Sequence, residues 1–275
     1  MAVLPFLFLY HFSRAQNTLL WKISRPDNAH VSYLLGTYHL TGPAFIDSFP
    51  VISEKINAAG LVVTETELNA GEVKLYYNSR SASDTLTQVL SKENVQTLQE
   101  ALNNKYDVFK LSPGELYVFL TVAYQRRVCQ PGVKDSLPAD LYIQRLAGKN
   151  NKTQFYLEKN QPEILRQSSA AIGWNLFKRQ APALLDRYRT GKYDANACQL
   201  AVEYASLSPK YNFRQSCPSA IPLEERNNQW VQTIRPLLNT KDCFIAVGYQ
   251  HLLYKCGLIQ QLIAAGYNVE PVTMK

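Results

Sequence analysis

The sequence predicts an α/β protein whose central sheet is built from two similar strand-GxxH-helix halves, with a helical insertion or cap. Residues 33–40 read YLLGTYHL and residues 245–252 read IAVGYQHL, so each carries an apolar run, a glycine, two residues and a histidine. The first and last thirds of the chain share the order strand, GxxH, helix, glycine, strand, whereas the middle third reads mostly as helix. An α/β core with an inserted helical unit fits this order.

Length and composition indicate a globular protein. The 275 residues suit one domain with a sizeable core, or one domain with an inserted subdomain. Of these residues, 46% are hydrophobic and 19% are charged, which excludes long disordered stretches. The formal charge is +7, but Lys and Arg are scattered and no nucleic-acid-binding motif occurs, so we expect no nucleic acid partner.

The N-terminus has the pattern of a secretory signal. Residues 2–10 are almost wholly apolar, and Ser13 and Ala15 are small residues at the spacing that precedes signal cleavage. We therefore expect a signal peptide over 1–15, one mature domain over 16–275, and an exported protein that is periplasmic or secreted. The alternative is a buried N-terminal segment. No stretch reaches the roughly 18 apolar residues of a membrane helix, so no stable membrane span is expected.

Three elements are expected in the first third of the chain. Residues 31–35 (VSYLL) are short, apolar and β-prone, and a glycine follows them, as after a buried strand. Residues 50–59 show helical spacing, with Gly60 as a plausible C-cap. Residues 61–64 (LVVT) then read as a second strand, which runs directly into Glu65.

The middle third, about 71–205, reads as the helical insertion. Its clearest helix start is SPGE at residues 112–115, which offers an N-cap, a proline at the first helical position and a capping-box glutamate. Further helices are expected over 138–148 and over 162–205, the second with a break in it. Between them, residues 153–157 (TQFYL) read as a third strand.

The last third returns to the pattern of the first. Residues 206–222 contain prolines and serines and read as a loop. A helix is expected over 223–238 and a strand over 243–248. A second helix over 254–265 and a short strand over 267–272 complete the chain.

Five cysteines cannot all pair within one chain. In an exported protein one or two disulfides are expected, with Cys198–Cys217 as the first choice and Cys243–Cys256 as the second. No C-x-x-C occurs, which argues against a thiolate zinc site or a redox motif.

Ionisable side chains follow four of the predicted strands, where substrate clefts of α/β folds lie. They are His39, Glu65, Glu158 and His251. Either histidine alone would suit a structural role, but two in matched contexts favour a shared site. Two His and a Glu form the ligand set of many metal hydrolases, whose metal lowers the pKa of a bound water. The alternative is metal-free chemistry, with one His as general base oriented by a carboxylate.

Alternatives also apply to the individual acidic residues. Glu65 and Glu67 point to opposite faces if the strand continues, so only one can share a cleft with His39, and we choose Glu65. Glu158 could instead cap the following helix. Arg226, on the helix before the last strands, could clamp a carboxylate or stabilise an oxyanion, or only pair with neighbouring acidic residues.

Five short segments, in this order, resemble the TraB/GumN family, to which the Tiki metalloproteases belong. They are LWKIS with YLLGTYHL, LVVTETEL, DLYIQRLAGKNNKTQFYLEKNQ, ERNNQW, and AVGYQHLLYKCGLIQQLIAAGYNVEPV. The likeness runs from Leu20 to the C-terminus. Two departures stand out: SLPAD leaves the equivalence of Asp140 open, and Tyr249 and Gln250 replace smaller residues inside the second GxxH.

The resemblance implies a role for six residues of this chain. His39 and His251 match the two GxxH histidines and Glu65 the acidic residue after the second strand. Glu158 matches the Leu-Glu position, and Arg226-Asn227 match the Arg-Asn pair. Members of the Tiki branch are implied to be metal-dependent proteases supported by manganese or cobalt. Related folds include an esterase and a haem-binding type, so the scaffold does not fix the reaction.

Residues and resemblance together predict a metal-dependent, peptidase-like hydrolase of the TraB/GumN type that acts on a peptide or small acyl substrate. His39, Glu65 and His251 would hold a divalent metal, with Mn or Co favoured over Zn. Glu158 would be general base or orienter, and Arg226 with Asn227 would complete the catalytic set. The alternatives are a non-catalytic protein that binds a metal, haem or small ligand, and a metal-free esterase with a His general base.

Overall fold

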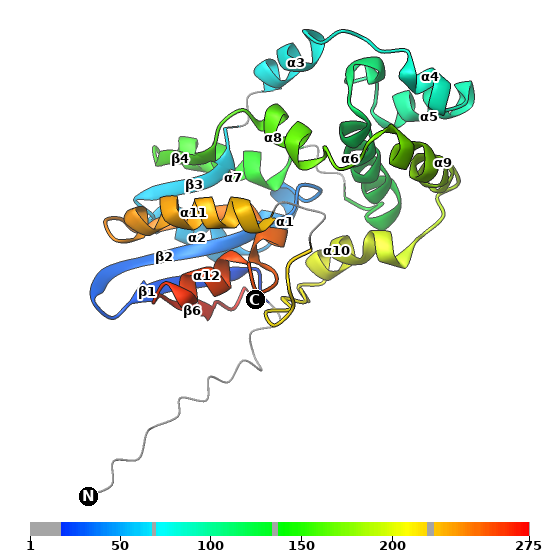
Figure 1. Ribbon diagram of the computed structural model, residues 1–275. Coiled ribbons are helices and arrows are strands. Elements are labelled where there is room, and N and C mark those ends of the chain that lie inside the picture. Colours follow the sequence, from blue (N-terminus) through cyan, green and yellow to red (C-terminus); the bar gives the residue numbers. More distant parts are fainter. Residues whose placement is uncertain (1–17, 68–69, 134–136, 219–222, 275) are drawn as a thin grey trace, which may run out of the picture.

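The computed structural model describes residues 18–67, 70–133, 137–218 and 223–274. A six-stranded sheet with the order β4-β3-β5-β2-β1-β6 forms the centre of the protein (Figure 1). The strands are β1 Leu20–Arg25, β2 Asn28–Thr37, β3 Leu61–Thr66, β4 Thr153–Glu158, β5 Cys243–Gly248 and β6 Asn268–Pro271. The predicted α/β class is confirmed. The expected signal peptide lies outside the described residues.

The sheet is mixed. From β4 through β3 and β5 to β2 all neighbours are parallel, whereas β1 is antiparallel to both β2 and β6. The five predicted strands are present, and β1 is an additional strand that the sequence analysis did not assign. Its residues LWKISR bury three of the first four positions and do not alternate cleanly, so the period-two signal of a strand is weak there.

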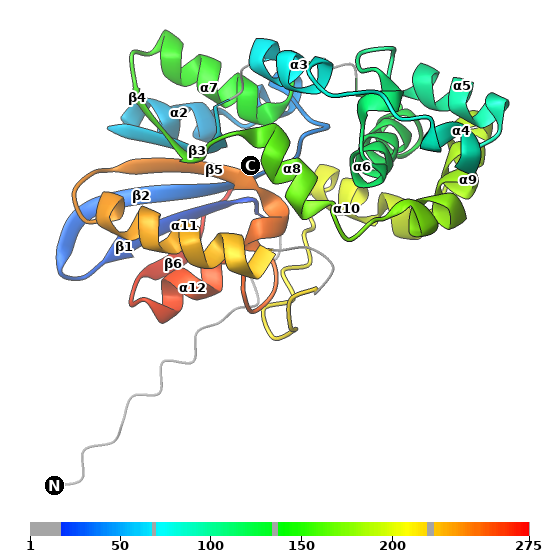
Figure 2. The same cartoon turned by 45° about the horizontal axis from the view of Figure 1, so that its top comes forward.

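Helices cover both faces of the sheet. On one face lie α1 (Pro43–Asp47), α2 (Pro50–Ala58) and α7 (Ala139–Lys149), and on the other α11 (Leu223–Leu238) and α12 (Leu258–Ala264), as Figure 2 shows. A sheet covered on both faces needs apolar side chains on both, which explains the unbroken apolar run of β5. Among the described residues, no helix is both long and apolar enough to cross a membrane.

A second, helical unit lies beside the carboxyl ends of the parallel strands (Figure 1). Its own apolar cluster runs from Tyr77 to Cys198 and is separate from the cluster around the sheet. The unit consists of α3 (Ala70–Asn78), α4 (Thr85–Val89), α5 (Lys92–Ala101), α6 (Pro113–Tyr124), α9 (Trp174–Thr190) and α10 (Ala195–Ala205), and α8 (Gln161–Ser168) leads into it from β4. The expected insertion over 71–205 therefore also contains α7 and β4, which belong to the sheet layer.

Several helix boundaries follow the local sequence. The capping box at Ser112 and Glu115 is confirmed at the start of α6. The helix expected over 162–205 is three helices, and Asn160, not Glu158, caps α8 by accepting from the Glu163 N–H. The helix expected over 254–265 begins only at Leu258, because residues 253–257 form bends and turns after the 3₁₀ turn η4 (Tyr249–Leu252).

Both predicted disulfide pairings are wrong. The structure links Cys129 to Cys198 and Cys217 to Cys256, and leaves Cys243 as a buried free thiol. Cys243 opens the buried strand β5, so its side chain lies in the core rather than near another cysteine. The pairing of Cys129 with Cys198 depends on the packing of the π turn η3 (Gln125–Cys129) against α10, which the sequence does not reveal.

Candidate active site at the carboxyl edge of the sheet

The sheet brings the predicted site residues to one edge. In the register of the parallel strands, Thr37 of β2 lies opposite Gly248 of β5, and Thr66 of β3 lies opposite Glu158 of β4. The carboxyl ends of these strands therefore meet, as expected for the binding edge of a parallel sheet. The residues that follow face the helical unit (Figure 1).

Arg226, on α11, is the centre of this site. Its Nε and Nη2 donate to the two oxygens of Glu158 at 2.8 and 2.9 Å, and Nη2 also donates to Oε2 of Glu65 at 3.1 Å. Its Nη1 lies 3.1 Å from Nε2 of His251. Burial lowers the pKa of Arg226, but the hydrogen bonds to Glu158 and the charges of Glu65 and Glu158 outweigh it, so the net pKa is raised. The guanidinium is permanently charged here.

Trp230 holds the Arg226–Glu158 pair in place. Its indole Nε1 donates to Oε1 of Glu158 at 2.9 Å, and the guanidinium of Arg226 lies 4.7 Å from the centre of its ring. Arg226 and Trp230 are four residues apart on α11, so they share one face of the helix. The Arg-Asn-x-x-Trp spacing therefore places Arg226 and Trp230 where both can bind Glu158. Trp230 is the last residue of the ERNNQW segment but was not among the predicted site residues.

His251 is buried and neutral. Asn227 donates its amide N–H groups to the carbonyls of His251 and Cys256, so its Oδ1 accepts from Nδ1–H of His251 at 2.6 Å. The proton on Nδ1 leaves Nε2 as an acceptor for Arg226. Burial, with the positive charges of Arg226 and His39 nearby, lowers the pKa of His251 to about 4. Asn227 therefore orients His251 rather than meeting a substrate.

His39 differs from His251 in both exposure and charge. Its side chain is 62% exposed, and its Nδ1 lies 2.6 Å from Oδ2 of Asp140, whose own side chain is only 10% exposed. Thr37 donates its hydroxyl to the other oxygen of Asp140. The charge of Asp140 raises the pKa of His39 to about 9. Nε2 is the ring nitrogen that Asp140 leaves free.

Asp140, whose equivalence the sequence left open and which was not among the predicted site residues, is the partner of His39. Burial raises its pKa, but the charge and hydrogen bond of His39 and the hydroxyl of Thr37 outweigh this, so the net pKa is lowered. It lies in the first turn of α7. The only sequence signal was an acidic residue just after Pro138, where carboxylates are common at any helix start.

Glu65 lies in β3 and contacts both the end of β5 and Arg226 of α11. Its Oε1 accepts from the Gly248 N–H at 2.5 Å, while Oε2 accepts from Arg226. A Cβ on Gly248 would lie 3.1 Å from Oε1, so the glycine of the second GxxH leaves room for this carboxylate. Glu67 does not line the cavity over His39 but lines a neighbouring groove beside β4. The structure thus places Glu65, and not Glu67, next to Arg226.

A cavity of about 150 Å³ opens over these groups. Its sheet side is lined by His39, Glu65 and Arg226, and its opposite side by Ile164, Leu165 and Ser168 of α8. The cavity therefore offers charged groups on one wall and mostly apolar groups on the other, which suits a small acyl group with a polar carbonyl.

The residues in this arrangement do not fit a metal held by His39, Glu65 and His251. In the part of the chain that the structure describes, no group of three or more His, Cys, Asp and Glu side chains is placed to hold a metal ion. Nε2 of His251 and Oε2 of Glu65 both face the guanidinium of Arg226, and Nδ1 of His39 faces Asp140. A divalent ion shared by the three would require Arg226 to move away.

The sequence model described as the TraB/PrgY/gumN family matches residues 19–271, nearly the whole chain. No curated protein matches the chain, and no solved structure does.

Proposed function

Because the chain belongs to the TraB/PrgY/gumN family, we propose that it is a hydrolase that cleaves an acyl bond of a peptide or small ester. The observation that carries the proposal is the His39–Asp140 pair, which opens into the same cavity as Glu65 and Arg226. A histidine oriented by a carboxylate, beside a fixed cation, supplies the parts that acyl hydrolysis needs.

His39 is the general base of this proposal. Asp140 holds Nδ1, so Nε2 is left to take a proton from a water that attacks the acyl carbon. The raised pKa makes His39 a strong base whose unprotonated fraction grows as the pH rises toward about 9. Asp140 stabilises the imidazolium that forms when the water is deprotonated, and the imidazolium then gives this proton to the leaving alkoxide or amine as the acyl bond breaks.

Arg226 is positioned to stabilise the oxyanion that develops on the acyl carbonyl. It lines the cavity, and its hydrogen bonds to Glu158 fix its orientation. Trp230 donates to Glu158 and packs its ring against the guanidinium. A preorganised cation of this kind stabilises developing negative charge without moving during the reaction. Glu158 then orients Arg226 and is not the base, since both its oxygens accept from the guanidinium.

The metal-dependent version, implied by the resemblance to the Tiki branch, stays a prediction. A bound Mn or Co would act as a Lewis acid and lower the pKa of its water. His39, Glu65 and His251 could reach such an ion only in an arrangement other than the one described, so the steps above do not involve it.

The test is hydrolysis of p-nitrophenyl acetate and of a mixed peptide pool by the purified protein, before and after chelation. We expect ester hydrolysis that survives chelation, falls about 100-fold or more in His39→Ala, and is unchanged in His30→Ala. His30 is a matched control, because it pairs with Asp242 and does not line the cavity. No hydrolysis by a folded, metal-replenished protein would contradict the proposal and favour a ligand-binding role.

Calorimetric titration decides between the metal-free and the metal-dependent mechanism. Mn, Co and Zn are titrated into the wild type, His39→Ala and His251→Ala. If activity disappears on chelation and both variants lose stoichiometric metal binding, the metal-dependent mechanism is correct. The metal, and not His39, would then activate the water. Binding without any such loss would place the metal elsewhere on the protein.

We also propose that the protein is exported to the periplasm or secreted. Two disulfides among five cysteines support this, since structural disulfides persist in oxidising compartments. Intact-mass measurement of the protein from cell fractions tests it: export predicts loss of residues 1–15 and two oxidised cysteine pairs.

A further inference from the structure

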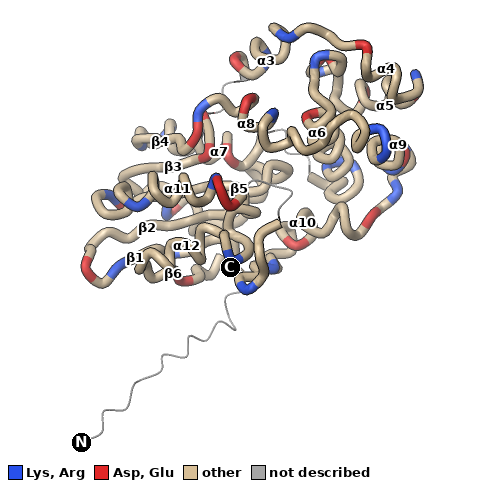
Figure 3. Tube along the Cα trace, in the orientation of Figure 1, with Lys and Arg blue, Asp and Glu red and all other residues tan. Residues whose placement is uncertain are grey.

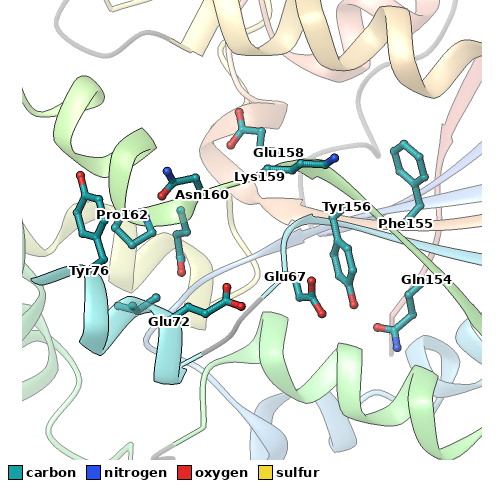
Figure 4. Close-up of a pocket in the computed structure, with 12 residues that line it drawn as sticks. Glu67, Glu72, Tyr76, Gln154, Phe155, Tyr156, Glu158, Lys159, Asn160 and Pro162 are labelled. Carbon is teal, nitrogen blue, oxygen red and sulfur yellow. The ribbon is translucent and has the colours of Figure 1, made fainter. Parts of the chain in front are cut away.

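A larger groove, of about 620 Å³, runs along β4, the edge strand of the sheet (Figure 4). Three consecutive residues of the strand line it: Gln154, Phe155 and Tyr156. Successive side chains of a strand point to opposite faces, and Figure 4 shows Phe155 on the other side of β4 from Gln154 and Tyr156. A groove that contacts all three must therefore lie against the open edge of β4, not on one face of the sheet.

The backbone of β4 is available at this edge. Within the described residues, β4 pairs with β3 on one side and has no strand on the other. At a sheet edge, alternate residues turn their N–H and C=O groups outward, ready to pair with another extended chain. The side-chain Oε1 of Gln154 is also buried without a hydrogen-bond partner.

The opposite wall of the groove is formed by helices. Glu72, Val73 and Tyr76 of α3 contribute to it, as do Asn160 and Pro162 at the start of α8. The space is thus bounded by a strand edge on one side and helical side chains on the other. Strand addition to a free edge, with side chains received by flanking walls, is a recurrent mode of peptide recognition.

We propose that this groove binds an extended peptide segment containing Lys or Arg, which pairs with β4 as an added strand. Two acidic side chains that line it, Glu67 and Glu72, favour a cationic segment over an acidic one. Lys159 is the single basic residue in the lining. Glu158 also lines the groove and is paired with Arg226.

The groove leads to the candidate active site. Glu158 and Gln161 line both this groove and the cavity over His39. One end of a segment paired with β4 would therefore pass Glu158 and enter that cavity. The inference rests on the proposed function in this respect, since it makes an extended peptide the substrate class of the hydrolase.

The test is binding of octapeptides selected from an unbiased displayed library on the full-length protein with His39→Ala, which prevents turnover. We expect selected peptides rich in Lys or Arg. Synthetic copies methylated at single backbone nitrogens should lose affinity at every second position, because only alternate N–H groups pair with β4. Equal sensitivity at all positions, or at none, would contradict strand addition.

Charge reversal tests the groove itself. The double variant Glu67→Lys with Glu72→Lys should bind the selected peptides about tenfold more weakly or worse. Glu100→Lys is the matched control, since Glu100 is exposed on α5 and does not line the groove. Selected peptides that bind the double variant as tightly as the control would overturn the assignment, as would failure to select any peptide.

The two proposals fail separately. Hydrolysis of p-nitrophenyl acetate by the wild type needs the cavity but no strand pairing. A protein that hydrolyses the ester but selects no peptide retains the proposed function and loses this inference. A protein that binds peptides with alternate methylation sensitivity but hydrolyses nothing retains the groove and loses the proposed function.

Discussion

At the scale of single residues, one guanidinium holds together parts of the chain that a metal ion was expected to join. Arg226 contacts Glu158 in β4, Glu65 in β3 and His251 in η4, the turn that follows β5. Two carboxylates close together need a nearby cation to remain charged in a partly buried site. Arg226 supplies that charge from a rigid, planar group, whereas a lysine would provide only a point charge.

Replacing Arg226 should therefore affect both stability and activity. Arg226→Ala leaves Glu65 and Glu158 without their counter-charge, and we expect the free energy of unfolding to fall by about 3 kcal/mol. Arg226→Lys should lose less stability but still lower kcat about 100-fold, because an ammonium cannot make the paired hydrogen bonds of the planar guanidinium. Urea denaturation and ester hydrolysis measure the two effects.

The control for Arg226 is Arg189→Ala. Arg189 is about half exposed and pairs with Glu93 and Asp186 on the surface. Its loss should change the free energy of unfolding by about 1 kcal/mol or less and leave activity unchanged. If Arg226→Ala were no more destabilising than this variant, the cluster would not depend on its cation.

His39 determines how the stability and the activity of the protein should change with pH. Its pKa is raised from 6.5 to about 9, so the stability it gains from Asp140 is complete below about pH 6.5. That stability is lost as the pH rises through about 9, and it should be about 1 kcal/mol or less because the imidazole is largely exposed. Activity should change in the opposite direction, since the base must be unprotonated.

Asp140→Asn removes the cause of this shift. In the variant the pKa of His39 should fall toward 6.5, which an NMR titration of the imidazole protons would show. The rising limb of kcat/KM against pH should move to lower pH by the same amount, and its plateau should drop. A wild-type rate that falls as the pH rises from 7 to 9 would instead make His39 a general acid.

At the scale of elements, the glycines of the two GxxH segments give the strand ends their geometry. Gly36 near the end of β2 packs directly beneath η4: a Cβ there would lie 2.7 Å from Cβ of Tyr249. Tyr204 donates its hydroxyl to the Gly36 carbonyl, which fixes the strand end from the helical unit. The first GxxH thus leaves space for the turn that carries the second histidine.

Gly36→Ala should therefore push η4 and His251 away from Arg226. Overpacking of this kind costs about 1–3 kcal/mol, and we expect the variant to lose that stability together with ester hydrolysis. Gly60→Ala is the control, because its added Cβ would meet only the Asp242 carbonyl, at 3.8 Å. Thermal unfolding and hydrolysis of both variants, measured side by side, give the result. If Gly36→Ala unfolds at the same temperature and hydrolyses the ester at the same rate as Gly60→Ala, η4 can shift to accommodate the added Cβ.

At the scale of the whole molecule, the sheet layer and the helical unit have separate apolar clusters, and the site lies where they meet. Acidic and basic residues are interspersed along both parts, as Figure 3 shows. Each part also contains one disulfide. Cys129–Cys198 closes a 69-residue separation within the helical unit, and Cys217–Cys256 closes one of 39 residues beside the sheet.

Removal of either disulfide should destabilise the protein substantially. By the chain-entropy relation, Cys129→Ser with Cys198→Ser should lower the free energy of unfolding by about 4 kcal/mol, and Cys217→Ser with Cys256→Ser by slightly less. Chemical denaturation with and without reductant checks this. Cys243→Ala is the control: it should keep the full sensitivity to reductant, because Cys243 is a free thiol.

The sequence by itself determined the local elements and the family. The period of apolar residues, the capping box at Ser112 and the two GxxH segments depend on neighbours a few residues apart, so they can be read along the chain. The strand-end positions of His39, Glu65, Glu158 and His251 followed from the same local signals. Their convergence followed from the expectation that parallel strands share one carboxyl edge.

Only the tertiary structure decided what these residues contact. Arg226 meets Glu158 across 68 positions of the chain and Glu65 across 161, and Asp140 reaches back to Thr37 across 103. The same holds for β1, for the disulfide partners and for the groove at the edge of β4. Each depends on which surfaces pack together, and packing joins segments whose separation in sequence leaves no local pattern to read.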